Sequence, residues 1–128
     1  MITSDSQAND FQMRFSDGER EALSDAGQQY GGAGDGFSPH SLLEAALGNC
    51  VGITVRMYAK KHDIPLESVR VTVRLDREDQ AVADFRYAIE LKGNLDQAQR
   101  DRLLRAARAC SVHRTLMRKL TFSQVDEV

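Results

Sequence analysis

Cysteine is the residue type in this sequence with redox chemistry of its own, and it occurs twice, at Cys50 and Cys110. A deprotonated thiol is a nucleophile and a metal ligand, so the pair is a candidate reactive site. The wide separation of the two cysteines excludes a thioredoxin-like CxxC motif. One alternative is that both are small core residues, because free cysteine is among the most frequently buried residue types.

A zinc site is the second alternative for these cysteines. Its ligands would be Cys50, Cys110, His113 and His40. Cys110 and His113 are spaced to share one face of a helix, and a thiolate with an imidazole suits zinc. The sequence lacks a paired CxxC motif, however, so it does not favour a metal site.

The element that must position Cys50 is a long helix within residues 37–61. Ser38 is a suitable N-cap, and Pro39 then occupies the first helical position, where its missing N–H costs nothing. Apolar residues cover most of the helix circumference, which is typical of a buried helix. Gly48 and Gly52 lie on one face and indicate tight packing. We therefore expect Cys50 in the middle of a long, buried central helix.

The elements that must position Cys110 follow in the second half of the chain. Alternating apolar and charged residues at 69–75 and 85–92 predict an antiparallel hairpin with helices on one face. A helix from about residue 96 to 109, capped by Asp96 or Asn94, places Cys110 at its end on the inward face. A short helix within 111–119 and a last strand at 120–125 complete the prediction.

The N-terminal part predicts a smaller sheet. Residues 1–9 are polar and predict disorder. Phe11, Met13 and Phe15 alternate with polar residues as in a half-buried strand, and Asp17-Gly18 predicts a hairpin with a return strand at 19–24. The glycine-rich segment 25–36 matches no phosphate-binding motif, which favours a flexible surface loop.

Composition indicates a single α+β domain over residues 1–128. The net charge of −2 at pH 7 gives no basic footprint for nucleic acid. No apolar run approaches the roughly 18 residues that a membrane span needs, so we expect no membrane partner. The N-terminus lacks the pattern of a signal peptide, and we therefore expect the cytoplasm, where thiols stay reduced.

Two runs of sequence resemble the OsmC/Ohr superfamily. Residues 34–71, GDGFSPHSLLEAALGNCVGITVRMYAKKHDIPLESVRV, resemble its loop, cysteine-bearing helix and strand. Residues 102–116, RLLRAARACSVHRTL, resemble its second cysteine motif, and the similarity covers roughly residues 30–125. The resemblance implies an α+β fold in which antiparallel strands of an intertwined homodimer wrap around two central helices.

The resemblance also implies thiol peroxidase activity as part of an oxidative stress response. Cys50 would be the peroxidatic cysteine that reduces an organic hydroperoxide, and Cys110 would resolve the sulfenic acid as a disulfide. An external dithiol would then reset the enzyme by exchange, without a metal or other cofactor. An apolar lining from Leu43, Leu47 and Met57 would favour alkyl or lipid hydroperoxides.

Accessory residues are the point at which this sequence departs from the family. Characterised relatives hold the thiolate with an arginine of the N-terminal hairpin, for which Arg14 and Arg20 are the candidates. A glutamate soon after the proline positions that arginine, but His40 occupies this place here and Glu44 is the nearest acid. We expect His40 to help set the pKa of Cys50. The alternative function is a non-catalytic relative that binds a small hydrophobic ligand at the dimer interface.

Overall fold

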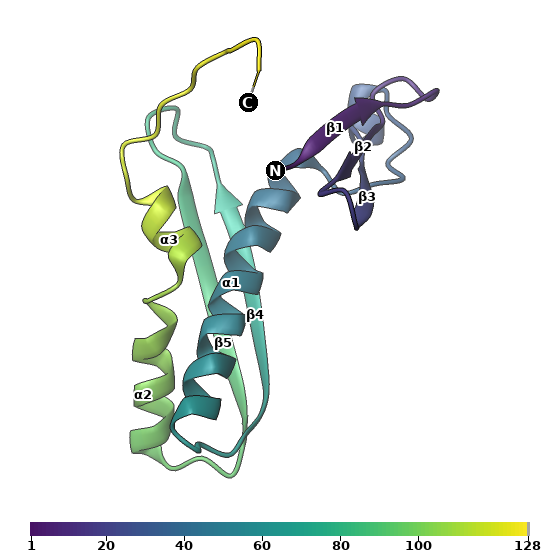
Figure 1. Ribbon diagram of the computed structural model, residues 1–128. Helices are drawn as coiled ribbons and strands as arrows, with labels where there is room; N and C mark the ends of the chain where they lie inside the picture. The colour runs from purple at the N-terminus through teal and green to yellow at the C-terminus, as the bar shows by residue number, and fades with distance from the viewer. Residues whose placement is uncertain (128) are drawn as a thin grey trace. The chain divides into compact units, whose positions relative to one another are not determined.

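The computed structural model describes residues 1–127 and divides the chain into two compact units, Met1–Ala45 and Ala46–Val128. The order of elements is β1, β2, β3, the 3₁₀ helix η1, α1, β4, β5, α2 and α3 (Figure 1). The single domain over residues 1–128 stays a prediction.

The first unit contains a three-stranded antiparallel sheet in the order β1-β2-β3. Its strands are β1 (Thr3–Ser6), β2 (Met13–Ser16) and β3 (Glu21–Ser24). The predicted disorder of residues 1–9 is therefore wrong. Every side chain of β1 is exposed, so its sequence carries no apolar pattern, and the strand is held by backbone pairing with β2.

The turn between β2 and β3 confirms the predicted hairpin. Asp17 Oδ1 accepts the N–H groups of Glu19 and Arg20 at 2.9 and 2.7 Å, and Gly18 adopts a φ of 98°. Phe11, in contrast, is exposed with a φ of 68° and belongs to the turn before β2 rather than to the strand.

The segment after β3 is more ordered than the predicted flexible loop. It contains η1 (Gln28–Tyr30), and its first residue, Asp25, is buried. Asp25 Oδ2 accepts the N–H groups of Gly34 and Asp35 at 2.9 and 3.2 Å. One carboxylate therefore joins the two ends of this glycine-rich segment.

The predicted long helix is present as α1 (Pro39–Lys61), with Ser38 Oγ accepting the Ser41 N–H at 3.1 Å. Within the chain only one face of α1 is buried, along a stripe of residues four apart: Leu47, Val51, Val55 and Ala59. Ile53 and Met57 on the other side are 59% and 67% exposed. The helix is central, but its apolar surface exceeds what one chain covers.

The second unit is built on the hairpin of β4 (Leu66–Asp76) and β5 (Asp84–Gly93). The predicted antiparallel register is present, with Val71 opposite Ile89 and Val73 opposite Tyr87. Alternation directs these residues to one face, where they pack against the buried stripe of α1. A Cβ on Gly48 would lie 3.2 Å from Val73 Cγ2, so the absence of a side chain there lets α1 lie close to β4.

The helix α2 (Gln97–Ala107) lies beside α1 on the same face of the hairpin (Figure 1). Asp96 caps it in a reciprocal capping box with Gln99. Its buried residues Leu103 and Ala107 join the core formed by α1. The predicted positions of Asp96 as cap and of the inward face are confirmed.

The chain continues through α3 (Ser111–Leu116), and residues 117–127 form no further helix or strand. The predicted strand at 120–125 is therefore absent from the part of the chain that the structure describes. A strand needs a backbone partner, and Phe122 is 92% exposed. None of the helices within residues 1–127 has the length and hydropathy needed to cross a membrane. The α+β fold with antiparallel sheets and a long central helix is confirmed.

Candidate active site

The structure brings Cys50 and Cys110 together in the second unit. Cys50 lies in the middle of α1, and Cys110 lies between the end of α2 and the start of α3. Both are free thiols; Cys50 packs against the buried cluster that contains Cys110, and each cysteine shifts the pKa of the other. The expected proximity of the two sulfur atoms is therefore present, while their catalytic roles remain a prediction.

The environment of Cys50 favours the thiolate. Desolvation by partial burial raises its pKa, but hydrogen bonds from the Cys110 thiol and from the backbone and side chain at the start of α3 outweigh this effect. These donors include the backbone N–H groups of Val112 and Ser111 and the Ser111 hydroxyl, whose oxygen lies 3.6 Å from Cys50 Sγ. The net result lowers the pKa of Cys50 to about 7.

The environment of Cys110 favours the thiol. Its side chain is 0% exposed. Burial raises the pKa of Cys110, and so does its hydrogen bond to Cys50. Cys110 Sγ also accepts the His113 N–H at 3.4 Å and thereby caps α3. A protonated Cys110 is the form that can donate a hydrogen bond to a Cys50 thiolate.

The two environments suit the two roles in a redox pair, a reactive nucleophile and a second cysteine that reacts with its oxidised form. Cys50 is partly accessible and about half ionised at neutral pH, as a nucleophilic sulfur must be. Cys110 is inaccessible to solvent but touches Cys50, so it is placed to react with an oxidised Cys50 and with little else. The arrangement supports thiolate attack on a small electrophile followed by disulfide formation.

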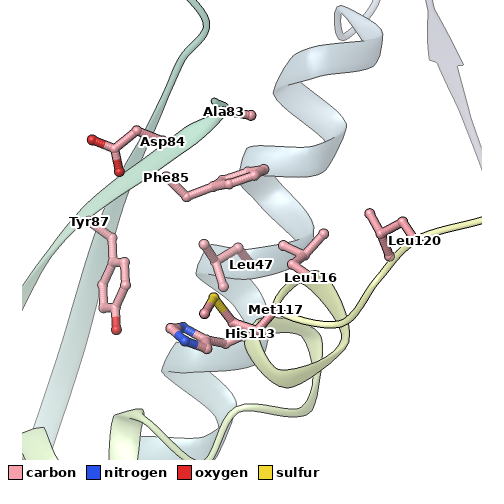
Figure 2. Close-up of a pocket in the computed structure, with 9 residues that line it drawn as sticks. All are labelled: Leu47, Ala83, Asp84, Phe85, Tyr87, His113, Leu116, Met117 and Leu120. Atoms are coloured by element: carbon pink, nitrogen blue, oxygen red, sulfur yellow. The ribbon is translucent and has the colours of Figure 1, made fainter. Parts of the chain in front are cut away.

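A cavity of about 290 Å³ lies on the same part of the second unit (Figure 2). Its wall comes from α1, the start of β5, α3 and the segment after α3: Leu47, Ala83, Asp84, Phe85, Tyr87, His113, Leu116, Met117 and Leu120. Of the predicted apolar lining, Leu47 is present in this wall. Leu43 and Met57 are exposed on α1 and do not line this cavity, and their part in a substrate lining stays a prediction.

The accessory candidates all belong to the first unit. Arg14 pairs with Glu21 at 2.9 Å and with Asp5 at 3.7 Å. Arg20 pairs with Asp17 at 3.3 Å and with Glu19 at 3.5 Å.

The other two accessory candidates lie at the start of α1, where His40 is exposed and Glu44 is half-buried. The groups that shift the pKa of Cys50 are instead Cys110, Ser111 and Val112. The proposed part of His40 in setting that pKa therefore stays a prediction.

The zinc alternative receives no support from the geometry. Within residues 1–127, no three or more histidine, cysteine, aspartate or glutamate side chains are grouped so that they could hold a metal ion. The two cysteines alone are too few for a tetrahedral zinc site.

Sequence reasoning missed the contribution of α3. The hydroxyl and backbone N–H of Ser111 lower the pKa of Cys50, and His113 donates its backbone N–H to the capping sulfur of Cys110 and lines the cavity. Ser111 follows Cys110 directly at a helix start, where free N–H groups are available, and this position is the signal that could have identified it. Tyr87 of β5 carried no such signal, because it was one of several inward residues of a strand.

Comparison with known proteins identifies the family of this chain. The family model described as OsmC-like protein matches residues 32–124. No curated protein matches the chain with significance.

Solved structures share the fold at low identity. An OsmC-like protein from Mycoplasma pneumoniae is 19% identical, with a TM-score of 0.76 over 91% of this chain and 85% of that one. The organic hydroperoxide resistance protein OsmC from Legionella pneumophila is 21% identical, with a TM-score of 0.64 over 91% and 88%. An organic hydroperoxide resistance protein from Elizabethkingia anophelis is 17% identical, with a TM-score of 0.66 over 92% and 87%. The family match covers most of the sequence, and the chain belongs to the OsmC-like protein family.

Proposed function

We propose that this protein reduces organic hydroperoxides with Cys50 as the peroxidatic and Cys110 as the resolving cysteine. The observation that carries the proposal is the packing of Cys50 against the cluster that contains Cys110, with the pKa of Cys50 lowered to about 7 and that of Cys110 raised. The Legionella pneumophila and Elizabethkingia anophelis neighbours are named as organic hydroperoxide resistance proteins, which supports the same class of substrate.

The reaction proceeds in three balanced steps. The Cys50 thiolate attacks the terminal peroxide oxygen, a sulfur–oxygen bond forms, the O–O bond breaks, and the alcohol leaves after taking up a proton. The Cys110 thiol then displaces hydroxide from the Cys50 sulfenic acid, which gives a disulfide and water. An external dithiol reduces the disulfide by exchange and is itself oxidised. The thiol form of the resting enzyme suits a reducing compartment such as the cytoplasm.

The decisive experiment is a thiol titration before and after one equivalent of cumene hydroperoxide, combined with intact mass. We expect both thiols to disappear and the mass to fall by two hydrogen atoms. Retention of both thiols with consumption of no peroxide would refute the proposal. The Cys50→Ser variant serves as the control for peroxide that decays without enzyme.

We also propose that the protein acts as a homodimer. Ala46, Ile53 and Met57 are exposed on α1 on the same side as the half-buried Cys50. Together with Cys50 they follow one another at steps of four, three and four residues, which is the spacing of a helix-pairing seam. Light scattering at micromolar concentration should give twice the mass of one chain, and a stable monomer would contradict the proposal.

A second candidate function is the binding of a small hydrophobic ligand without turnover. The mostly apolar wall of the 290 Å³ cavity is the observation that favours it. The two functions separate in the Cys50→Ser variant, because a binding module keeps its ligand affinity while a peroxidase loses turnover. Unchanged thiols after cumene hydroperoxide treatment of the unsubstituted protein would also favour binding alone.

A further inference from the structure

The residue that connects the cysteine pair to the cavity is His113. Its backbone N–H binds Cys110 Sγ at 3.4 Å, and its side chain lines the cavity. Leu47, which lies one helical turn before Cys50 on α1, lines the same cavity. The cavity wall thus includes the residue three positions before Cys50 and the residue three positions after Cys110.

The imidazole of His113 has polar atoms that the fold leaves available. Its ring contacts the Tyr87 ring edge-on, with centroids 6.5 Å apart. Figure 2 shows the His113 ring next to Tyr87, at the end of the cavity away from Phe85. The hydrogen bonds within residues 1–127 include none to a ring nitrogen of His113, although the backbone N–H of this residue is used.

Cleavage of the peroxide O–O bond in the proposed reaction needs a proton for the departing oxygen. When a thiolate cleaves an alkyl hydroperoxide, the departing oxygen becomes an alkoxide, which is a poor leaving group unless it is protonated. Three side chains with titratable groups line the cavity, namely Asp84, Tyr87 and His113. Asp84 already accepts a hydrogen bond from Arg86 at 2.8 Å, and a carboxylate carries no proton to give. Histidine is the one of the three types that exchanges a proton near neutral pH.

We propose that His113 is the proton donor to the leaving oxygen of the hydroperoxide, an inference that rests on the proposed peroxidase function. The imidazolium gives its proton to the alkoxide oxygen while the Cys50 thiolate takes the terminal oxygen of the peroxide. The products are the Cys50 sulfenic acid, the alcohol and a neutral imidazole, so charge and electrons balance. Solvent returns the proton to His113 before the next turnover.

Two variants of His113 separate proton transfer from packing. His113→Phe keeps an aromatic ring against Tyr87 but removes the donor. His113→Gln keeps a hydrogen-bond donor that cannot give up its proton. Both leave in place the His113 backbone N–H that the Cys110 sulfur accepts as the cap of α3. The matched control is His62→Phe, because His62 is exposed at the end of α1, and phenylalanine preserves its ring contact with Tyr58.

The test compares two oxidants under single-turnover conditions. tert-Butyl hydroperoxide releases an alkoxide that must be protonated, whereas peracetic acid releases a carboxylate that is stable without a proton. We expect both His113 variants to react about 100-fold more slowly with tert-butyl hydroperoxide but within a few-fold of the unsubstituted protein with peracetic acid. The His62→Phe control should match the unsubstituted protein with both oxidants.

The outcomes distinguish this inference from the proposed function. Equal slowing with both oxidants would show that His113 acts through structure, and an unchanged rate with tert-butyl hydroperoxide would show that it has no part in the step. Either result overturns the inference while the unsubstituted protein remains a peroxidase. If the unsubstituted protein reacts with neither oxidant, the proposed function itself fails, and the inference fails with it.

Discussion

Cys50 and Cys110 are neighbours in the fold, yet their surroundings shift their pKa values in opposite directions. Cys50 is partly exposed and receives hydrogen bonds from the start of α3, which lower its pKa to about 7. Cys110 is fully buried, and burial together with its hydrogen bond to Cys50 raises its pKa. The two residues are chemically identical, so the difference in reactivity comes from position alone.

This comparison teaches that the pair depends on one short element. The same first turn of α3 that donates backbone N–H groups to Cys50 is capped by Cys110. The start of α3 therefore stabilises the Cys50 thiolate, while the Cys110 sulfur serves as the N-cap of the same helix. The strongest test of the difference between Cys50 and Cys110 is to substitute each cysteine separately.

Removing the accessible sulfur should have the largest effect. Cys50→Ser should abolish hydroperoxide consumption, because a hydroxyl is not ionised at neutral pH and is a far weaker nucleophile than a thiolate. The measurement is loss of cumene hydroperoxide with excess dithiol. Residual turnover in this variant would show that Cys110 or another group can initiate the reaction. The proposed difference in reactivity between Cys50 and Cys110 would then be contradicted.

Removing the buried sulfur should leave the reaction of Cys50 with hydroperoxide intact, but it should remove the protection of Cys50 against over-oxidation. In Cys110→Ser, one equivalent of hydroperoxide should leave a Cys50 sulfenic acid, and excess peroxide without reductant should carry it to the sulfinic acid. Intact mass should show the addition of one and then two oxygen atoms. The unsubstituted protein should stop at the disulfide, and equal over-oxidation of both proteins would argue against a resolving role.

The hydrogen bond between the sulfurs can be tested without removing the nucleophile. Cys110→Ala removes the donor, so the pKa of Cys50 should rise from about 7 towards the ordinary thiol value. The ionised fraction at pH 7 should then fall from about one half to below about one tenth, taking an ordinary thiol pKa of roughly 8.5.

Cys110→Ser is the matched control, because its hydroxyl can still donate to Cys50. Alkylation of Cys50 by iodoacetamide as a function of pH measures both variants. Superimposable profiles for Cys110→Ala and the unsubstituted protein would mean that this hydrogen bond does not stabilise the thiolate.

The smallest expected effect concerns Ser111. Its oxygen is 3.6 Å from Cys50 Sγ, which is a long hydrogen bond. Ser111→Ala should slow alkylation of Cys50 at pH 7 only about twofold, which corresponds to roughly 0.5 kcal/mol. Thr115→Ala, an exposed position of the same helix, is the control. A loss of tenfold or more would show that the hydroxyl, rather than Cys110 or the backbone, is the main donor.

The sequence predicted the elements whose side chains alternate or repeat against a core. Val71 and Ile89 lie on one face of their hairpin because strand residues alternate, and Ser38-Pro39 starts α1 because capping is local chemistry. Strand β1 was missed because its side chains are all exposed and only its backbone pairs. The strand predicted around Phe122 failed for the opposite reason, because alternation is present without a backbone partner in the described chain.

The site was predictable only in part. Cys50 and Cys110 stand out by residue type and by resemblance to a family, but their contact depends on how α2 ends beside α1. The roles of Ser111 and His113 arise from N–H groups and a cavity that exist only after α3 has formed. Residue type identifies reactive atoms, whereas the groups that tune them are assembled by tertiary structure.

Cys110 also links the redox reaction to the mechanics of the fold. Its sulfur caps α3, and α3 supplies His113 and Leu116 to the cavity wall, with Met117 following as the C-cap of the helix. In the proposed cycle this sulfur bonds to Cys50 and is later released, so each turnover changes the restraint at the start of that helix. A redox cycle at Cys110 would therefore alter the cap of the same helix that contributes His113 and Leu116 to the cavity wall.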